Sequence, residues 1–265
     1  MMRIVLPEGD DPRIREAAEF LRVQGLADPI LLTGVDDLRE ACQIVRDHEA
    51  DAVIAGIDLP TRDIVQVVHD TIGAKDQVYS SCFLLERDGR DGRPERLILA
   101  DAGVNKNPTA DELYHILEQT YITAETLLNQ QPRVALLSYS THGSGFDNEA
   151  PDADILKLRE VLERSRREHP LWIIDGELQL DAAISDEISF KKAPRSTLAG
   201  NANVFIVPNL AAGNVLFMAL KHFAGFRAYG PLLQGFNAPC SDLSRGATTA
   251  DIIGTAVCIT KLFNK

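Results

Sequence analysis

Apolar residues in this chain alternate between short continuous runs and longer segments in which they recur every three or four positions. The short runs, such as residues 3–6 and 52–55, contain β-branched residues and are typical of buried strands. The longer segments, such as the one that Pro12 opens and Gly25 ends, have the spacing of helices with one buried face. This alternation predicts an α/β fold with a largely parallel sheet covered on both faces.

The same pattern divides the rest of the chain. We expect strands at residues 3–6, 30–32, 52–55, 78–86, 96–100, 134–137, 172–174, 204–207 and 228–233. After the helix at Pro12, we expect helices at 35–48, 61–72, 109–128, 153–168, about 181–190, 211–223 and 249–263. The strands at 78–86 and 96–100 are predicted to form a hairpin through the turn-rich link at 87–92. No Pro/Gly/Ser-rich linker marks a boundary, so one domain and two domains both remain open.

Composition narrows the class of protein. Hydrophobic residues make up 45% of the 265 residues and charged residues 25%, as in an ordinary globular protein. No run of 18 apolar residues predicts a transmembrane helix, and the acidic start of the chain does not resemble a signal peptide. The four cysteines form no CxxC pair, which indicates reduced thiols and a cytoplasmic protein. The net charge of −12 argues against nucleic acid or an anionic membrane as a partner, but still allows a small anionic substrate.

A polar loop follows the predicted strand at 134–137, where ligands of parallel sheets bind. Its hydroxyls, histidine and glycine offer O–H and N–H donors to an anion, and its candidate binding residues are Ser138, Ser140, Thr141, His142, Gly143 and Ser144. The alternative is a loop whose hydroxyls bond their own backbone. Three acids follow the strand at 172–174, namely Asp175, Glu177 and Asp181. Their spacing fits no standard metal site, and Asp181 is explained by capping of the next helix, so we expect no metal.

The segment 237–251 is the richest in candidate chemistry. It places a hydroxyl, a guanidinium and a carboxylate at the start of the last predicted helix, in Ser244, Arg245 and Asp251. The purely structural alternative is a capping box formed by Thr248 and Asp251. The signatures GxSxG, GxxxxGK[ST] and GxGxxG are absent from the sequence.

Taken in order, these segments resemble the phosphotransacetylase (phosphate acetyltransferase) family. The resemblance is carried by residues 4–11 with Arg13, 25–32, 100–105 with 107–109, 136–141, 175–179, 192–194, 199–200, 203–205, 208–210 with 213–214, 230–231 with 234–235, and the DLSRG motif at 242–246. The matches are colinear from about Ala52 to the end of the chain, which makes them more specific than any single motif.

The resemblance implies a fold like that of isocitrate and isopropylmalate dehydrogenases, with two α/β domains, a cleft between them and usually a homodimer. Residues 1–75 and 234–265 would form one domain, and residues 76–233 the other. Ser244, Arg245 and Asp251 would then face the polar loop across the cleft.

The resemblance also implies the reaction, in which acetyl-CoA and phosphate give acetyl phosphate and CoA. Ser244 would stabilise the reacting carbonyl, Arg245 would bind the phosphate group, and Asp251 would be the base for the CoA thiol. The polar loop and Asn214 would bind substrate. Coenzyme A is a substrate here, and the resemblance implies no cofactor.

The chain departs from the family pattern in its first domain. It is shorter by several tens of residues, and the gap lies between Gly34 and Asp51. The missing segment normally carries an arginine that contacts CoA, and a second such arginine falls on Gln66, one helical turn from Arg62. His142 stands where a lysine is common. These losses predict weak CoA binding, and because the related phosphotransbutyrylases also have a shorter first domain, another acyl group remains open.

Three hypotheses therefore stand beside one another. The first is an active phosphate acyltransferase. The second is a non-catalytic or altered-specificity relative that binds a phosphorylated or acyl metabolite, since a shared fold does not fix function. The third is a dehydrogenase-like enzyme, which the missing dinucleotide fingerprint disfavours.

Overall fold

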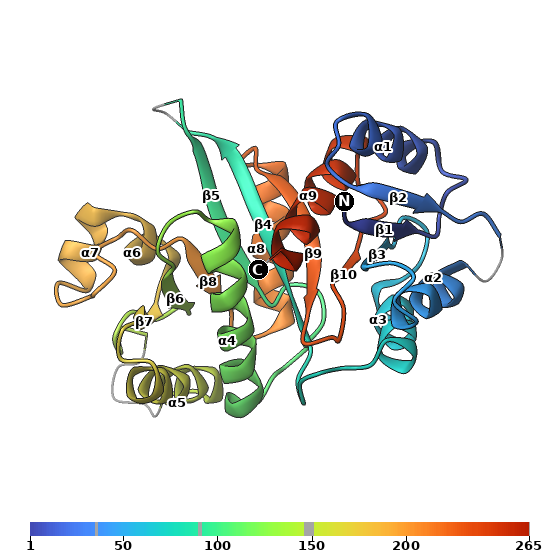
Figure 1. Cartoon of the computed structure of the whole chain (residues 1–265). Helices are drawn as coiled ribbons and strands as arrows, with labels where there is room; N and C mark the ends of the chain where they lie inside the picture. The colour runs from blue at the N-terminus through green and yellow to red at the C-terminus, as the bar shows by residue number, and fades with distance from the viewer. Residues whose placement is uncertain (35–36, 90–91, 146–150, 265) are drawn as a thin grey trace. The chain divides into compact units, whose positions relative to one another are not determined.

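The structure, a computed structural model, describes residues 1–34, 37–89, 92–145 and 151–264 (Figure 1). The middle of the predicted link at 87–92 and the first residues of the predicted helix at 35–48 lie outside these residues. The chain forms two compact units, one made of Met1–Leu84 with Arg227–Lys265 and the other of Leu85–Phe226. The domain boundaries expected from the resemblance stay a prediction.

The first unit is built on a mostly parallel set of strands. Its strands β1 (Arg3–Leu6), β2 (Asp28–Leu31), β3 (Ala52–Ala55), β9 (Arg227–Gln234) and β10 (Cys240–Asp242) are ordered β2-β1-β3-β10-β9. The pairs β1–β2, β1–β3 and β3–β10 are parallel, and β10–β9 is antiparallel. All four residues of β3 are buried, as expected for a strand covered on both faces. Strand β4 (Ser80–Asp88) follows β9 in the sheet, and its residues 85–88 belong to the second unit.

Four helices belong to this unit: α1 (Pro12–Val23), α2 (Asp37–Arg46), α3 (Thr61–Thr71) and α9 (Thr249–Phe263). Asp11 caps α1 by accepting a hydrogen bond from the Arg13 N–H. Helix α1 packs against α9, and α2 packs against α3. Figure 1 shows these two pairs on opposite sides of strands β1 to β3, as the sequence pattern predicts.

The second unit has the strand order β5-β8-β6-β7, with β5 (Pro94–Ala100), β6 (Arg133–Leu137), β7 (Ile173–Leu178) and β8 (Val204–Ile206). The pairs β5–β8, β6–β8 and β6–β7 are parallel. Its helices are α4 (Ala110–Leu127), α5 (Ala153–Glu168), α6 (Leu180–Ile184), α7 (Asp186–Lys192) and α8 (Leu210–His222). In the described part of the chain, every helix is too short or too polar to cross a membrane.

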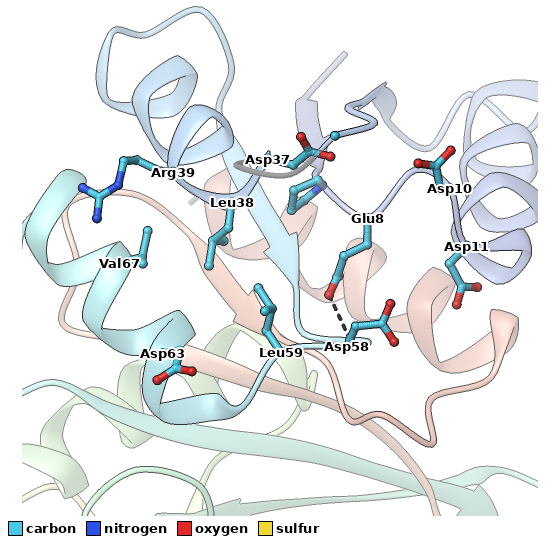
Figure 2. Close-up of a pocket in the computed structure, with 12 residues that line it drawn as sticks. Glu8, Asp10, Asp11, Asp37, Leu38, Arg39, Asp58, Leu59, Asp63 and Val67 are labelled. Carbon is cyan, nitrogen blue, oxygen red and sulfur yellow. Dashed lines mark hydrogen bonds between the residues drawn. The ribbon is translucent and has the colours of Figure 1, made fainter.

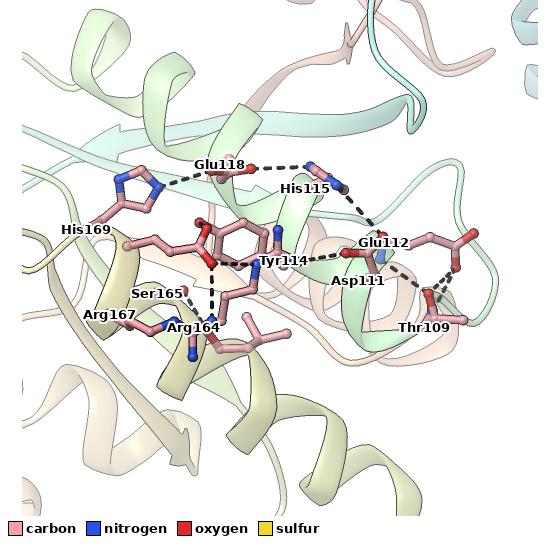
Figure 3. A network of polar contacts seen from close by, with 12 residues as sticks. Thr109, Asp111, Glu112, Tyr114, His115, Glu118, Arg164, Ser165, Arg167 and His169 are labelled. Carbon is pink, nitrogen blue, oxygen red and sulfur yellow. Dashed lines mark hydrogen bonds and ion pairs between the residues drawn. The ribbon is translucent and has the colours of Figure 1, made fainter.

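Helices α4 and α5 are joined by a network of charged and aromatic side chains (Figure 3). The Tyr114 hydroxyl donates to Glu168 at 2.9 Å, and the Arg164 guanidinium lies 3.7 Å from the centre of the Tyr114 ring. His169, just beyond α5, lies 3.0 Å from Glu118 on α4. His115 lies 3.2 Å from the same carboxylate. These two histidines therefore have structural partners.

The largest differences from the sequence prediction concern β7, β10 and the helix expected at 181–190. Strand β7 continues through the buried Asp175 and Glu177, where Arg166 and Arg159 each pair with one of these carboxylates at 2.9 Å. Strand β10 was not predicted, because it is only three residues long and two of them are polar. The helix predicted at 181–190 is two helices, since Ser185 adopts an extended backbone, ends α6 and caps α7.

The predicted capping role of Asp181 is wrong. The N-cap of α6 is Gln179, and Asp181 lies within the helix, where its carboxylate accepts from the Ala182 N–H and pairs with Lys192 at 2.7 Å.

Candidate active site

The DLSRG motif lies at the carboxyl edge of the first unit. Its aspartate, Asp242, ends β10, which runs parallel to β3, so the loop that follows shares an edge with the loops after β1 and β3. In open parallel sheets this edge is where ligands bind. Ser244 is half-buried in this loop and Arg245 is exposed.

Ser244 turns the chain back toward the last helix. Its carbonyl accepts from the Ala247 N–H at 2.8 Å, and its hydroxyl oxygen accepts from the Gly246 N–H at 3.4 Å. A hydroxyl donates as well as accepts. The Ser244 hydroxyl can therefore donate a hydrogen bond to a substrate oxygen.

Asp251 is the third residue of α9 and forms the predicted capping box. Its carboxylate accepts from the Thr248 N–H at 3.1 Å, and its own N–H donates to the Thr248 hydroxyl at 3.2 Å. The residue is only 8% exposed. The structural role of Asp251 is thus confirmed, and its role as a base stays a prediction.

Two further carboxylates shape this edge, and sequence reasoning gave neither a role of its own. Glu8, after β1, accepts from the N–H groups of Gly56 and Asp58 at 2.9 and 3.0 Å, which ties it to the loop after β3. Asp242 is buried beside Gly56, where an added Cβ would lie 2.2 Å from the Asp242 carboxylate. Burial raises the pKa of Asp242 to about 7, with a smaller rise from the nearby charge of Glu8.

A cavity of about 480 Å³ opens beside these loops (Figure 2). It is lined by Pro7, Glu8, Asp10, Asp11, Gly34, Asp37, Leu38, Arg39, Asp58, Leu59, Asp63 and Val67. Of the described residues that line it, Arg39 is the only basic one, and neither Ser244 nor Arg245 belongs to the lining. Carboxylates at this density repel phosphate groups, so this cavity is unsuited to an anion.

In the second unit, the predicted polar loop is organised by the buried carboxylate of Glu177. This carboxylate accepts from the Ser140 hydroxyl at 3.0 Å and from the Gly143 N–H at 2.6 Å, and Arg159 pairs with it at 2.9 Å. Burial works to raise the pKa of Glu177, but the hydrogen bonds from Arg159, Gly143 and Ser140 outweigh it and leave the pKa below its usual value.

The hydroxyls of the loop are largely engaged within the second unit, as the structural alternative held. The Ser140 hydroxyl oxygen accepts from the Gly145 N–H at 3.0 Å, and that of Ser144 accepts from the Thr141 N–H at 3.0 Å. The Thr141 hydroxyl oxygen accepts from the Gln179 N–H at 3.0 Å, and both Ser140 and Thr141 are buried.

The outer part of the loop is open to solvent. His142 and Ser144 are exposed, and Ser138 is half-buried. His142 Nε2 lies 3.2 Å from a carboxylate oxygen of the buried Asp175, without hydrogen-bond geometry. Asn214 is exposed on α8. A binding role for any of these residues stays a prediction.

The structure thus places Ser244 and Arg245 on one loop and Asp251 in the first turn of the helix that follows, and it holds Ser140 and Gly143 of the polar loop on Glu177. That the two sets face each other stays a prediction. Glu177 was named from sequence only as a possible ligand or base. Its organising role could not be found there, because its partner Ser140 lies 37 residues away.

The sequence of the chain is similar to those of a known protein family. A model of the phosphate acetyl/butaryl transferase family matches residues 33–260. The chain is 35% identical to a phosphate acetyltransferase of Thermoanaerobacterium thermosaccharolyticum over 308 aligned positions, which cover 95% of this chain and 92% of the relative. Because this alignment is longer than the chain, the relative carries residues that the chain lacks.

Solved structures agree in fold. A phosphotransacetylase from Streptococcus pyogenes aligns with a TM-score of 0.85 and 31% identity, covering 99% of this chain and 94% of the other. A putative 4-hydroxythreonine-4-phosphate dehydrogenase from Salmonella typhimurium aligns with a TM-score of 0.57 at 9% identity, covering 98% of this chain and 99% of the other, and shares the fold alone. The predicted dehydrogenase-like α/β fold is confirmed, and the chain belongs to the phosphate acetyl/butaryl transferase family.

Proposed function

We propose that the chain is a phosphate acyltransferase that moves a short acyl group, most simply acetyl, between coenzyme A and inorganic phosphate. The observation that carries the proposal is the presence of a hydroxyl, a guanidinium and a buried carboxylate on one loop and helix start, in a member of this family. These three groups match what the reaction requires: a base, a donor to the carbonyl oxygen and a cation for phosphate.

In the direction of acyl-CoA synthesis, Asp251 takes the proton of the CoA thiol. The thiolate attacks the carbonyl carbon of the acyl phosphate, and the electron pair of the C=O bond moves onto oxygen, where the Ser244 hydroxyl donates to it. Collapse of this intermediate breaks the C–O bond to phosphate, which leaves as an anion bound by Arg245. The reverse direction runs through the same groups, and it requires no metal or cofactor.

We further propose that Ser138, His142, Gly143, Ser144 and Asn214 contact substrate. Ser140 and Thr141 would act with them by holding the loop in shape, since their hydroxyls already have partners. The exposed donors of His142 and Ser144 suit a phosphate oxygen. His142→Ala should then raise the KM for phosphate, while a substitution at exposed Phe190 should not.

We infer a homodimer in the cytoplasm. Helix α8 is apolar on nearly all sides, yet Val215, Met218 and, just beyond it, Phe223 are exposed, which is unusual for a surface helix. A second copy of the chain would cover them. The four cysteines, which all lie in the described part of the chain, are buried and form no disulfide, as suits a reducing compartment. Light scattering of the parent and of Val215→Glu would test the dimer, which the substitution should weaken.

The function is tested by release of CoA thiol from acetyl-, propionyl- and butyryl-CoA, with and without phosphate. An acyltransferase releases thiol only when phosphate is present, and the ratio of kcat/KM values identifies the acyl group. Binding of phosphate without turnover of any of the three would instead support the non-catalytic relative.

A further inference from the structure

Arg13, at the start of α1, reaches the loop of the DLSRG motif 232 residues away in sequence. Its Nη1 donates to the carbonyl oxygen of Arg245 at 3.0 Å and to that of Ala247 at 2.9 Å. The guanidinium thus holds both ends of the tripeptide that follows Ser244.

Asp11 fixes the guanidinium in this position. It accepts from Arg13 Nε at 3.0 Å and from Nη2 at 2.7 Å, so the two side chains form a two-point pair. The same carboxylate caps α1 by accepting from the Arg13 N–H at 2.7 Å. The Asp11 carboxylate therefore holds both the backbone and the guanidinium of Arg13 at the start of the helix.

The contact reaches the reacting groups through one peptide unit. The carbonyl of Arg245 and the N–H of Gly246 belong to the same planar peptide. Its carbonyl accepts from Arg13, and its N–H donates to the Ser244 hydroxyl at 3.4 Å. Rotation of this peptide would break both hydrogen bonds and move the Ser244 hydroxyl and the Arg245 side chain together.

We propose that Arg13 is a positioning residue for the acyl transfer, which acts by fixing the orientation of the 245–246 peptide and hence of Ser244 and Arg245. The inference rests on the proposed function of these two residues. Arg13 itself is directed at backbone oxygens, so we assign it no contact with substrate.

The chain provides a matched control on the same helix. Arg15 also donates to two backbone carbonyls, those of Gly9 and Asp10, each at 2.8 Å. Arg15→Gln therefore removes a guanidinium, these two hydrogen bonds and the pair of Arg15 with the Asp10 carboxylate at 3.3 Å, close to the same helix start, and Arg15 has no hydrogen bond to the DLSRG loop among the described contacts. Asp11→Asn is a second probe, because asparagine still caps a helix but no longer forms the charged pair with Arg13.

The test measures kcat and both KM values of Arg13→Gln, Arg13→Lys, Asp11→Asn and Arg15→Gln, together with their melting temperatures. Misplaced catalytic groups cost on the order of 10²-fold in rate. We expect Arg13→Gln to lower kcat by about 10- to 100-fold and to raise the KM for phosphate, with the KM for CoA unchanged. Arg13→Lys and Asp11→Asn should lose less, and Arg15→Gln should keep parental kinetics.

A double variant separates positioning from stability. If Arg13 acts through Ser244 and Arg245, the loss in kcat caused by Arg13→Gln should be smaller in the Ser244→Ala background than in the parent, whereas independent effects would multiply. The inference is overturned if Arg13→Gln and Arg13→Lys behave like Arg15→Gln while Ser244→Ala is impaired. If Ser244→Ala itself turns over like the parent, the proposed function of the motif fails and the inference fails with it.

Discussion

Replacing Asp251 by asparagine separates the two roles that its geometry allows. Both hydrogen bonds of the capping box can survive the change, because the amide oxygen of asparagine can accept from the Thr248 N–H and the backbone N–H of residue 251 is retained. What is lost is the negative charge at a helix start, worth about 0.3–1 kcal/mol. For a chain of this size we therefore expect the melting temperature to fall by no more than about 2–4 °C.

Activity should change far more than stability. An amide cannot accept the thiol proton, so Asp251→Asn should lose roughly 10²–10⁴-fold in kcat when acetyl phosphate and CoA are the substrates. The loss should shrink at alkaline pH. With a thiol pKa near ~8.5, the thiolate fraction rises from about 3% at pH 7 to about 75% at pH 9, so the variant should recover up to about 25-fold relative to the parent.

Thr248→Ala is the matched control, because it removes the cap and leaves the carboxylate. It should cost about 0.5–2 kcal/mol of stability. Its folded fraction should keep most of its activity, with no relief at high pH. A role of Asp251 as the thiol base is refuted if purified, folded Asp251→Asn turns over like the parent from pH 7 to 9. The base would then be another group or the substrate itself.

Three other changes test separate parts of the structure. Burial raises the pKa of Asp242 from 3.8 to about 7, so the native state keeps a proton that the unfolded chain has lost between these values. The free energy of unfolding should therefore fall as pH rises through this range, by at most about 4 kcal/mol, and urea titrations of Asp242→Asn should show that this fall is absent. Gln66→Arg should lower the KM for CoA more than it raises kcat. Because Gln66 donates to Asp70 at 2.9 Å, the fall in KM should be larger when Asp70→Asn is added. An effect on kcat alone would contradict a CoA contact at position 66. Gly213→Ala would bring a Cβ within 2.5 Å of the Asp101 carbonyl oxygen, so it should destabilise the protein by roughly 1–3 kcal/mol in thermal unfolding, and an unchanged stability would show that α8 can shift.

Local signals were enough to predict most of the fold. The bounds of β1, β3, α5 and α9 agree with the sequence prediction, because apolar runs and cap residues act within a few positions. Strand β7 was predicted too short because Asp175 and Glu177 are buried with partners on α5, which no local pattern reveals. Strand β10 was missed because it is only three residues long and two of its residues are polar.

The candidate site could likewise be predicted only in part. The chemical types at Ser244, Arg245 and Asp251 are visible in the sequence, and so is the capping alternative at Thr248. The residues that hold the loops in place cannot be identified from the sequence, because their contacts are distant along the chain. Arg13 meets the motif loop across 232 residues.

The charge of the chain bears on how it can bind its expected substrates. The protein carries a net charge of −12, and Arg39 is the only basic residue among the described ones that line the cavity of the first unit. Coenzyme A carries several phosphate charges, so this cavity offers it little attraction. Under the proposed function, transfer to or from inorganic phosphate needs only a local cation, which the exposed Arg245 would supply next to Ser244 in sequence. If the contacts to CoA are lost as the sequence predicts, uniform binding should weaken while the chemical step is kept. The chain should then show a high KM for CoA with an ordinary dependence of kcat on Ser244 and Asp251.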